Sequence, residues 1–368
     1  HPTRARAPRS ADPALPSIGS MPATTTAPSS PLRTWWSQRP PAAGAAVMAT
    51  AILSVALHQT GYETLSRIAL TLACAAWLAL AVDFLARLLW DHDRWEKEAA
   101  TPAALTALTA VAATTVLGTR FTALGWEPLA KALLALAALL WPGLAIAVVR
   151  HWHRRMPGAV FLGCVATQGL AVLGATLAAS EATAWLAHTA LVLFWLGLLL
   201  YVIALPRFDP RHMANGAGDH WVAGGALAIS ALAGAKLIAA DSARLYLWND
   251  DDSGVLRAVT VALLVLDLAW YAALLIAEIA WPRLRYDVRR WATVFPMGMT
   301  AAATLAVATA VDVPWLKTPG EVLLWIAVAA WLAVTAGALR TYTGPGRPGA
   351  KSDPGTTPES DVTSTTRR

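Results

Sequence analysis

Residues 287–304 read DVRRWATVFPMGMTAAAT, and this stretch contains the features that decide the fold. Two arginines precede Trp291, a pattern typical of the boundary of a membrane helix. Phe295 is the one large aromatic residue in the small-residue run that follows, and Pro296 comes directly after it. A proline inside a membrane helix removes a backbone donor and bends the segment. The pattern predicts either an aromatic plug beside a kink in a narrow pore or a packing aromatic next to a tolerated proline.

The composition is that of a membrane protein. The chain has 368 residues, of which 56% are hydrophobic and 14% charged, and its mean hydropathy is +0.48. A soluble domain carries roughly 25% charged residues, so this chain lacks the polar side chains needed to cover it in water. Its apolar residues form repeated runs of about 20, the length that crosses a bilayer as a helix. The sequence therefore predicts an all-α integral membrane protein.

The residues that commonly hold metals or form disulfides do not gather into a site. Cys74 and Cys164 both lie inside apolar runs and are interpreted as small hydrophobic residues. His151 and His153 have no third ligand and are better explained as part of a basic loop at the membrane surface. We therefore expect no metal, no cofactor and no nucleic-acid partner.

The apolar runs predict ten spans. They cover about 42–58, 66–90, 102–119, 127–149, 157–180, 183–205, 220–240, 255–281, 290–312 and 319–340. Residues 41–341 therefore form the predicted transmembrane domain. The polar segments 1–40 and 342–368 are expected to be disordered cytoplasmic tails. The first tail has no run like a signal peptide, and Met21 is an alternative to His1 as the start.

The basic residues predict the orientation. One side of the membrane receives 22 of the 29 lysines and arginines, including those of both tails. The opposite loops hold scattered ones, among them Arg67, Arg120, Arg244 and Lys317. Because basic loops stay in the cytoplasm, both termini are predicted to be cytoplasmic in a multi-pass protein of the cell membrane. An even number of spans requires the two termini to be on one side.

The spans are of two kinds that alternate. The odd spans are small and hydroxylated, as in AAGAAVMAT at 42–50, whereas the even spans are bulky and carry most of the tryptophans. Small residues allow helices to approach closely, and bulky apolar residues suit a lipid-facing surface. The alternation predicts five helical hairpins, with the odd helices forming an inner pore ring and the even helices an outer ring. The alternative is an ordinary bundle that small residues tighten, with no conduit.

Three stretches carry a resemblance to a known family. Ten spans, small odd helices and WATVFPMGM at 291–299 resemble the tellurite-resistance/dicarboxylate transporter family, which includes slow-type anion channels and malic-acid transport proteins. VLGTR at 116–120 and GDHWVAGGALAIS at 218–230 are similar to bacterial members. The resemblance covers about 42–340. It implies a homotrimer with a five-helix pore in each protomer, and it implies that Phe295 matches the family's pore-occluding phenylalanine.

Polar side chains on the odd spans are candidates for lining the pore. An anion path needs weak, distributed attraction, which hydroxyl and amide donors supply. The candidates are Thr114, Thr115, Thr167, Gln168, Ser230, Thr300 and Thr304. The competing interpretation for each hydroxyl is a hydrogen bond back to its own helix.

Charged residues of the seventh span are candidates for the pore mouths. Lys236 lies ~24 Å beyond His220 at 1.5 Å per residue, so it is near the outer end of the span. It is interpreted either as a lysine that snorkels to the surface or as an anion-attracting mouth. Asp219 and His220 precede the span, and Asp219 is either the helix N-cap or part of the cytoplasmic entrance.

Acids on the even spans have structural interpretations. Asp83 and Arg87 are one helical turn apart and predict a local ion pair. Asp267 and Glu278 are interpreted as inter-helix or interfacial hydrogen-bonding residues, although acids inside a membrane are functional candidates by default.

Together these features predict passage of small anions through a narrow pore in each protomer, gated by Phe295 with Pro296 beside it. Chloride, nitrate, malate-like dicarboxylates, sulfite and tellurite-related oxyanions all remain open as the permeant. The alternative is a proton-coupled exporter of C4-dicarboxylates or oxyanions. Acids predicted on the external face, Asp241, Asp250 to Asp252 and Asp312, repel anions there, so export or passage of a neutral protonated acid fits at least as well as anion uptake. No carboxylate lies near the middle of an odd span, which favours a passive path.

Two other classes of protein were weighed. A membrane-embedded enzyme needs acids, bases or ligands that converge at one depth, and the spans have no such set, so no enzymatic activity is predicted. A structural or sensory membrane protein would leave Phe295 and the small-residue spans without a purpose.

Overall fold

Ten long α-helices and five short 3-10 turns account for the regular structure in the part of the chain that the structure describes. That part of the computed structural model comprises residues 43–90, 103–150, 152, 156–211, 218–241, 250–281 and 287–343. Within it, the extended backbone is limited to an isolated bridge between Met156 and Phe208. The prediction of an all-α protein with ten spans is confirmed.

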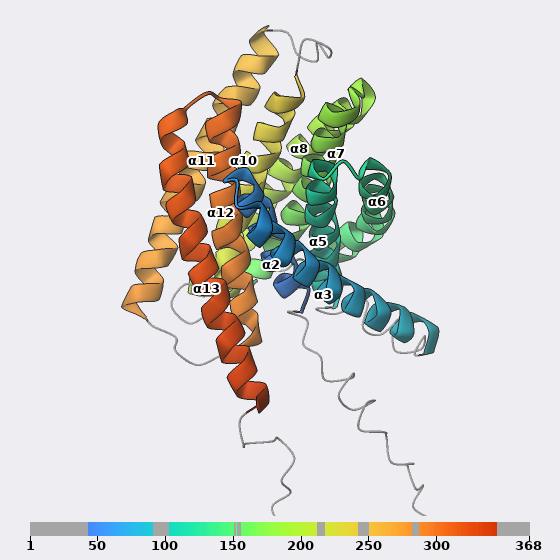
Figure 1. Cartoon of the computed structure of the whole chain (residues 1–368), viewed down its shortest axis with the longest axis vertical. Coiled ribbons are helices and arrows are strands. Elements are labelled where there is room, and N and C mark those ends of the chain that lie inside the picture. Colours follow the sequence, from blue (N-terminus) through green and yellow to red (C-terminus); the bar gives the residue numbers. More distant parts are fainter. Residues whose placement is uncertain are drawn as a thin grey trace, which may run out of the picture. The chain divides into compact units, whose positions relative to one another are not determined.

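The helices form five hairpins, each joining an odd predicted span to the even span that follows (Figure 1). The pairs are α2 (Ala43–Gln59) with α3 (Glu63–Trp90), α5 (Ala103–Ala123) with α6 (Glu127–Arg150), α7 (Leu162–Glu181) with α8 (Ala184–Ala204), α10 (Val222–Ala240) with α11 (Asp250–Ala280), and α12 (Trp291–Ala310) with α13 (Lys317–Thr343). We call the first member of each pair an inner helix and the second an outer helix. Helix α13 ends two residues beyond the predicted boundary at 341, and the rest of the predicted tails lies outside the described residues.

The inner helices pack in a closed ring. Helix α2 contacts α5, α5 contacts α7, α7 contacts α10, α10 contacts α12, and α12 returns to α2. Each outer helix packs against the inner helix of its own hairpin. Of the most apolar 18 residues, 94% are buried in the span that contains α7 and 83% in α10 and in α12, against 11% to 33% in the outer helices. The predicted arrangement, with odd helices inside and even helices outside, is confirmed.

Membrane crossing is clear from composition for most of these helices. Eight are long and apolar enough to span a bilayer, namely all five outer helices together with α7, α10 and α12. Helix α2 is a shorter apolar helix, and α5 is rich in threonine and has Arg120 in its last turn. Both are covered by other helices of the ring. Whether they cross the membrane therefore depends less on their own apolar content than on the helices that surround them. The chain is a multi-pass membrane protein.

Glycines set how closely the inner helices approach. A Cβ atom at Gly118 of α5 would lie 2.6 Å from a methyl carbon of Leu173 on α7, and one at Gly298 of α12 would lie 2.9 Å from Ile52 on α2. Real side chains do not tolerate such distances, so the ring needs glycine at these contacts. Small residues in the odd spans therefore serve ring closure, as close helix packing in membranes requires.

Candidate functional site

Phe295 is packed at the contact between α10 and α12. Its side chain is 1% exposed and lies in the second turn of α12. A Cβ atom at Gly225 of α10 would be 3.0 Å from Cε1 of Phe295 and 3.0 Å from Cγ of Pro296. The aromatic ring and the proline therefore occupy the space that a side chain at position 225 would need.

The other contacts of α12 show which way Phe295 is directed. Gly298 faces Ile52 of α2, and Thr300 faces Asp267 of the outer helix α11. Successive residues of an α-helix are ~100° apart, so Phe295 lies ~140° around the helix from Thr300 and between the directions of α10 and α2. Its ring is therefore on the side of α12 that faces the interior of the inner ring.

Met48 is an interior residue that the sequence reasoning missed. It is 0% exposed and lies on α2 between Gly44, which faces α5, and Ile52, which faces α12. Since Ile52 is level with Gly298, Met48 lies near the depth of Phe295, one turn earlier on α2. The signal was present in the sequence, because Met48 is the one large flexible side chain of the run AAGAAVMAT.

Tryptophans of three outer helices repeat one contact. Each donates its indole N–H, over 2.9 Å, to a threonine on the inner helix of the next hairpin, and the pairs are Trp77–Thr114, Trp141–Thr167 and Trp331–Thr50. The last pair joins α13 to α2 across the closure of the ring. Thr114 and Thr167 were predicted to line the pore, but their hydroxyls meet outer helices instead. A buried indole N–H needs an acceptor, and these threonines supply it.

Two further predicted lining residues also bond to outer helices. Oγ1 of Thr300 donates to Oδ1 of Asp267 on α11 at 3.2 Å, and Nε2 of Gln168 donates to the carbonyl of Phe194 on α8 at 3.0 Å. These side chains differ from the prediction because each bonds to a neighbouring outer helix. Oε1 of Gln168 has no hydrogen-bond partner among the described residues. The interpretation of Asp267 as an inter-helix hydrogen-bonding residue is confirmed.

The last three predicted lining residues bond within their own helices, the competing interpretation of the sequence. Thr115, Ser230 and Thr304 each donate to a backbone carbonyl three or four residues earlier, at 2.8, 2.7 and 2.7 Å. Thr304 is nine residues from Phe295, or ~180° around α12, so it lies on the face opposite the aromatic ring. A lining role for Thr115 and Ser230 stays a prediction.

Lys236 lies on the same face of α10 as the Phe295 contact. It follows Gly225 by 11 residues, which is ~20° more than three full turns and ~16 Å along the axis. Its side chain is half-buried and makes no ion pair with any residue that the structure describes. An ammonium group is thus placed on the interior face near the C-terminal end of the ring.

Asp219 and His220, the residues predicted at the other pore mouth, precede α10 in a different arrangement from the predicted N-cap. Asp219 begins a 3-10 turn, η3 (Asp219–Trp221), and the N-cap of α10 is Trp221. The predicted N-cap role of Asp219 is therefore wrong, because the chain enters α10 through this turn; its side chain lies outside the described part. His220 is 0% exposed, so it is enclosed by protein.

Acids accompany the two arginines that precede α12. Arg290, the N-cap of α12, donates to Glu278 of α11 at 2.5 Å, which confirms Glu278 as an interfacial hydrogen-bonding residue. Arg289 pairs with Asp287 at 3.0 Å, and its hydrogen bonds hold the pKa of Asp287 below the ordinary value. The predicted partner of Asp83, Arg87, has its side chain outside the described part.

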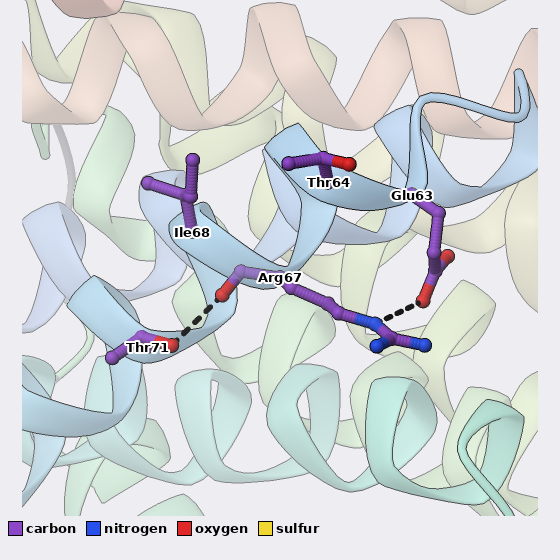
Figure 2. Close-up of a pocket in the computed structure, with 5 residues that line it drawn as sticks. All are labelled: Glu63, Thr64, Arg67, Ile68 and Thr71. Atoms are coloured by element: carbon purple, nitrogen blue, oxygen red, sulfur yellow. Dashed lines mark hydrogen bonds and ion pairs between the residues drawn. The ribbon is translucent and has the colours of Figure 1, made fainter.

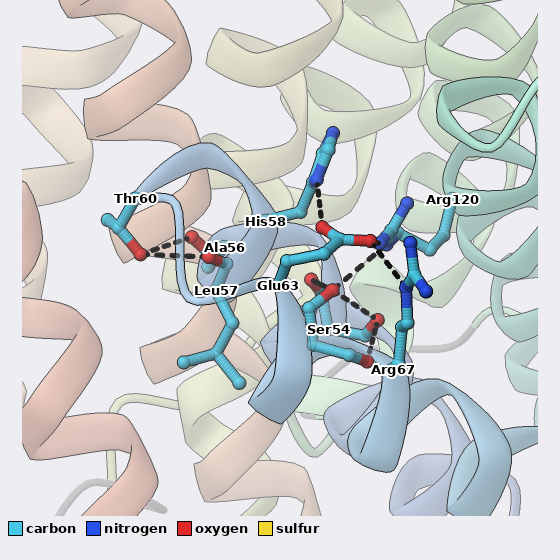
Figure 3. A network of polar contacts seen from close by, with 9 residues as sticks. Ser54, Ala56, Leu57, His58, Thr60, Glu63, Arg67 and Arg120 are labelled. Carbon is cyan, nitrogen blue, oxygen red and sulfur yellow. Dashed lines mark hydrogen bonds and ion pairs between the residues drawn. The ribbon is translucent and has the colours of Figure 1, made fainter.

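Arg120 belongs to a polar network at the C-terminal end of the ring (Figure 3). It is 1% exposed, and it donates from Nη2 to Glu63 at 2.7 Å and from Nε to Ser66 at 2.9 Å. Glu63 also accepts from Arg67 at 2.9 Å and bonds to His58 at 2.8 Å. The network joins α2, α3 and α5. It neutralises an arginine that the sequence placed among scattered loop residues, as a buried charge requires.

A cavity of about 430 Å³ lies beside this network on a single outer helix (Figure 2). Its lining residues are Glu63, Thr64, Arg67, Ile68 and Thr71 of α3. All of them are on α3, so the cavity is separate from the Phe295 contact. Among the described residues, no group of three or more His, Cys, Asp or Glu side chains is placed to hold a metal ion.

Comparison with known proteins gives two findings. Residues 38–339 match the profile of a protein family described as SLAC1, voltage-dependent anion channel. Over 136 residues the chain is 29% identical to two uncharacterized membrane proteins of Mycobacterium tuberculosis, Rv1735c of strain H37Rv and MT1776 of strain CDC 1551. These alignments cover 35% of this chain and 67% of each relative. The family match begins before α2 and ends within α13, so it spans all five hairpins.

Proposed function

Because this chain belongs to the voltage-dependent anion channel family, we propose that it passes small anions across the membrane through its inner ring and that Phe295 closes the path. The observation that carries the proposal is the position of Phe295. Its ring is 1% exposed, lies against Gly225 and is on the interior side of α12. Because Gly225 has no side chain, removal or rotation of the aromatic ring leaves space between α10 and α12.

The proposed path is apolar at its narrowest point. Met48 faces the interior near the depth of Phe295, and the two side chains form the proposed constriction. Conduction requires attraction weak enough for release, which a short apolar constriction with donors on either side provides. Thr115 and Ser230 remain the proposed donors on the inner helices.

Lys236 is the proposed anion attractor. Arg120 is less suited to this role, because it is buried and paired with Glu63. Lys236 shares the helix face of the Phe295 contact and is only partly exposed near the end of α10. A positive charge at a narrow opening raises the local anion concentration and the rate of entry.

The proposed assembly is a homotrimer with one path in each protomer, as the family resemblance implies. The outer helices expose large apolar side chains, among them Leu139 at 78% and Ile279 at 72%, which suit lipid or other copies of the chain. From the distribution of basic residues, the N-terminal ends of the inner helices are proposed to face the cytoplasm.

The test of the gate is Phe295→Ala in purified protein reconstituted into liposomes. Truncation removes the ring, so chloride or nitrate flux is expected to rise severalfold over the parent. The matched control is Phe194→Ala, which truncates a phenylalanine of the outer helix α8 that is 0% exposed. Size-exclusion elution and helix content show whether each variant is folded.

Two outcomes decide the proposal. A folded Phe295→Ala protein that conducts much faster than both the parent and Phe194→Ala supports the gate. Malate, sulfite and tellurite in the same assay then rank the permeants. A folded variant that passes none of these anions faster than the parent overturns the gate.

A further inference from the structure

We propose that Asp267 binds a proton reversibly and that this proton holds the gate helix α12 in its closed position. The inference rests on the proposed function and adds the regulation of the same path. Asp267 belongs to the outer helix α11 and is 0% exposed. Its Oδ1 accepts a hydrogen bond from Thr300 of α12, and its Oδ2 has no hydrogen-bond partner among the described residues.

Asp267 is the exception in a repeated contact. At three junctions between hairpins, an outer helix meets a threonine of the next inner helix through the neutral N–H of a tryptophan. At the junction of α11 with α12, the outer helix meets Thr300 through a carboxyl group. An indole joins the helices without the free-energy cost of burying an acid. A role beyond joining two helices accounts for the acid at this position.

The surroundings of Asp267 are those of a neutral carboxyl group. Tyr271, one turn further along α11, is close enough to interact electrostatically with Asp267. The ring of Tyr271 meets that of Trp221 edge to face at 5.5 Å, and neither its hydroxyl nor the indole N–H of Trp221 has a partner in the described part. An ionised oxygen beside unused donors would attract them. The closed arrangement, in which they stay unused, therefore corresponds to the protonated acid.

No cation offsets a charge on Asp267 in the part of the chain that the structure describes. The titratable groups on the elements around it are Tyr271 on its own helix, Tyr201 on α8, Cys164 on α7 and His220 in η3. Helix α12 presents the neutral Thr300, and the lysine of α10 is near the far end of that helix. An unpaired carboxylate in such a place carries a large desolvation cost, which proton binding avoids.

Polar groups on α11 provide a way for the proton to reach Asp267. Glu278, Tyr271 and Asp267 lie within ~40° of one another on one face of the helix. Glu278 is at the end where Arg290 begins α12 and is 23% exposed, so this end of the row meets solvent. Tyr271 lies between the two acids in the sequence of α11. Protons therefore exchange from the side proposed to be cytoplasmic.

The link to the gate runs through α12. Thr300, which bonds to Asp267, is five residues after Phe295 on the same helix. When the proton leaves, the charged carboxylate recruits Tyr271 and Trp221 and the contact between α11 and α12 changes. That change moves α12 and frees Phe295 from Gly225. Because a rise in pH removes the proton, flux rises as the pH on the cytoplasmic side rises.

The experiment compares anion flux in liposomes across a pH series for the parent, Asp267→Asn and Asp83→Asn. The parent flux is expected to rise as pH rises, by at most about tenfold per unit, the limit for one proton. The amide cannot lose a proton, so Asp267→Asn stays at the low-pH level throughout. Asp83→Asn removes a buried aspartate of another outer helix, α3, and keeps the parent profile.

A second measurement detects the protonation of Asp267 independently of anion flux. The infrared carboxylic-acid C=O band of the parent is expected to disappear as pH rises, and Asp267→Asn is expected to lack it. An Asp267→Asn protein with the parent's flux profile and an unchanged infrared band overturns the inference. If Phe295→Ala conducts no anion, the proposed function fails, while the infrared band still decides whether Asp267 binds the proton.

Discussion

At the scale of single residues, the proposed gate is a complementary pair of residues. Phe295 is the one large aromatic residue after Trp291 in its helix, and Gly225 has no side chain at the position that the aromatic ring contacts. The same glycine that allows α10 and α12 to approach also leaves no second barrier when the ring moves. A single rotation of an aromatic side chain is therefore enough to change the width of the proposed path.

Lys236 is the proposed anion attractor. We expect Lys236→Gln to lower anion entry from the C-terminal end of the ring roughly threefold to tenfold at low ionic strength, because the attracting charge is gone. The difference shrinks at high salt, since screening shortens the reach of a charge to a few ångström. Liposome flux at low and at high ionic strength measures both effects.

The matched variant for this position is Lys236→Arg, which keeps the charge and is expected to keep most of the flux. Equal flux in Lys236→Gln and the parent at both ionic strengths would show that the lysine only snorkels to the surface.

At the scale of elements, the inner and outer helices face different surroundings. The inner helix α5 is rich in threonine and ends with Arg120, and it is still a span because protein covers it. Many polar atoms on inner helices are paired with outer helices or with their own backbone. The outer helices carry the apolar surface that a bilayer needs. Hydropathy alone therefore describes the outer ring well and the inner ring poorly.

The tryptophan contacts between hairpins contribute stability in the membrane. We expect Trp141→Phe to lower the free energy of unfolding by about 0.6 kcal/mol and by no more than about 1.7, the range for single hydrogen bonds between membrane helices. The indole N–H to Thr167 is lost while the aromatic contact is largely kept. Unfolding in mixed detergent micelles, followed by circular dichroism, measures the change.

The control is Trp185→Phe on α8, whose side chain is 69% exposed and makes no hydrogen bond that the structure records. A loss of stability in Trp185→Phe equal to that in Trp141→Phe would assign the effect to the aromatic ring rather than to the hydrogen bond.

At the scale of the whole molecule, the first and last hairpins complete the ring. Helix α12 packs against α2, and Trp331 of α13 donates to Thr50 of α2. Ring closure therefore depends on contacts between segments almost 300 residues apart, which form only after the last hairpin is in place. The five hairpins act as one unit because each one supplies a helix to the same closed ring.

The orientation of this ring is tested by labelling single cysteines in cells. In a background with Cys74 and Cys164 replaced by alanine, Ser352→Cys is expected to react with a membrane-impermeant maleimide only after permeabilisation. Ser180→Cys, at the C-terminal end of α7, is expected to react in intact cells, because basic residues keep the opposite loops in the cytoplasm. The reverse pattern would contradict cytoplasmic termini.

The sequence by itself determined the class, the ten helices and their division into inner and outer rings. These features are local, because hydropathy, residue size and the position of arginines repeat along the chain and do not depend on which helices meet. The Phe295-Pro296 pair also stood out, since one large side chain in a small-residue helix is visible without a structure. Helix ends agreed within about five residues; the largest differences are the start of α7, where a 3-10 turn precedes the helix, and the start of α11, which begins at Asp250.

Only the tertiary structure decided where the polar side chains point. Thr114, Thr167, Gln168 and Thr300 were predicted to face the path, yet they bond to outer helices. Arg120 pairs with a glutamate 57 residues away, and Asp267 is enclosed with no cation beside it among the described residues. The physical reason is that a helix of the inner ring has neighbouring helices on nearly every side. A hydroxyl or carboxyl bonds to whichever neighbour is within reach, and packing between distant segments chooses that neighbour.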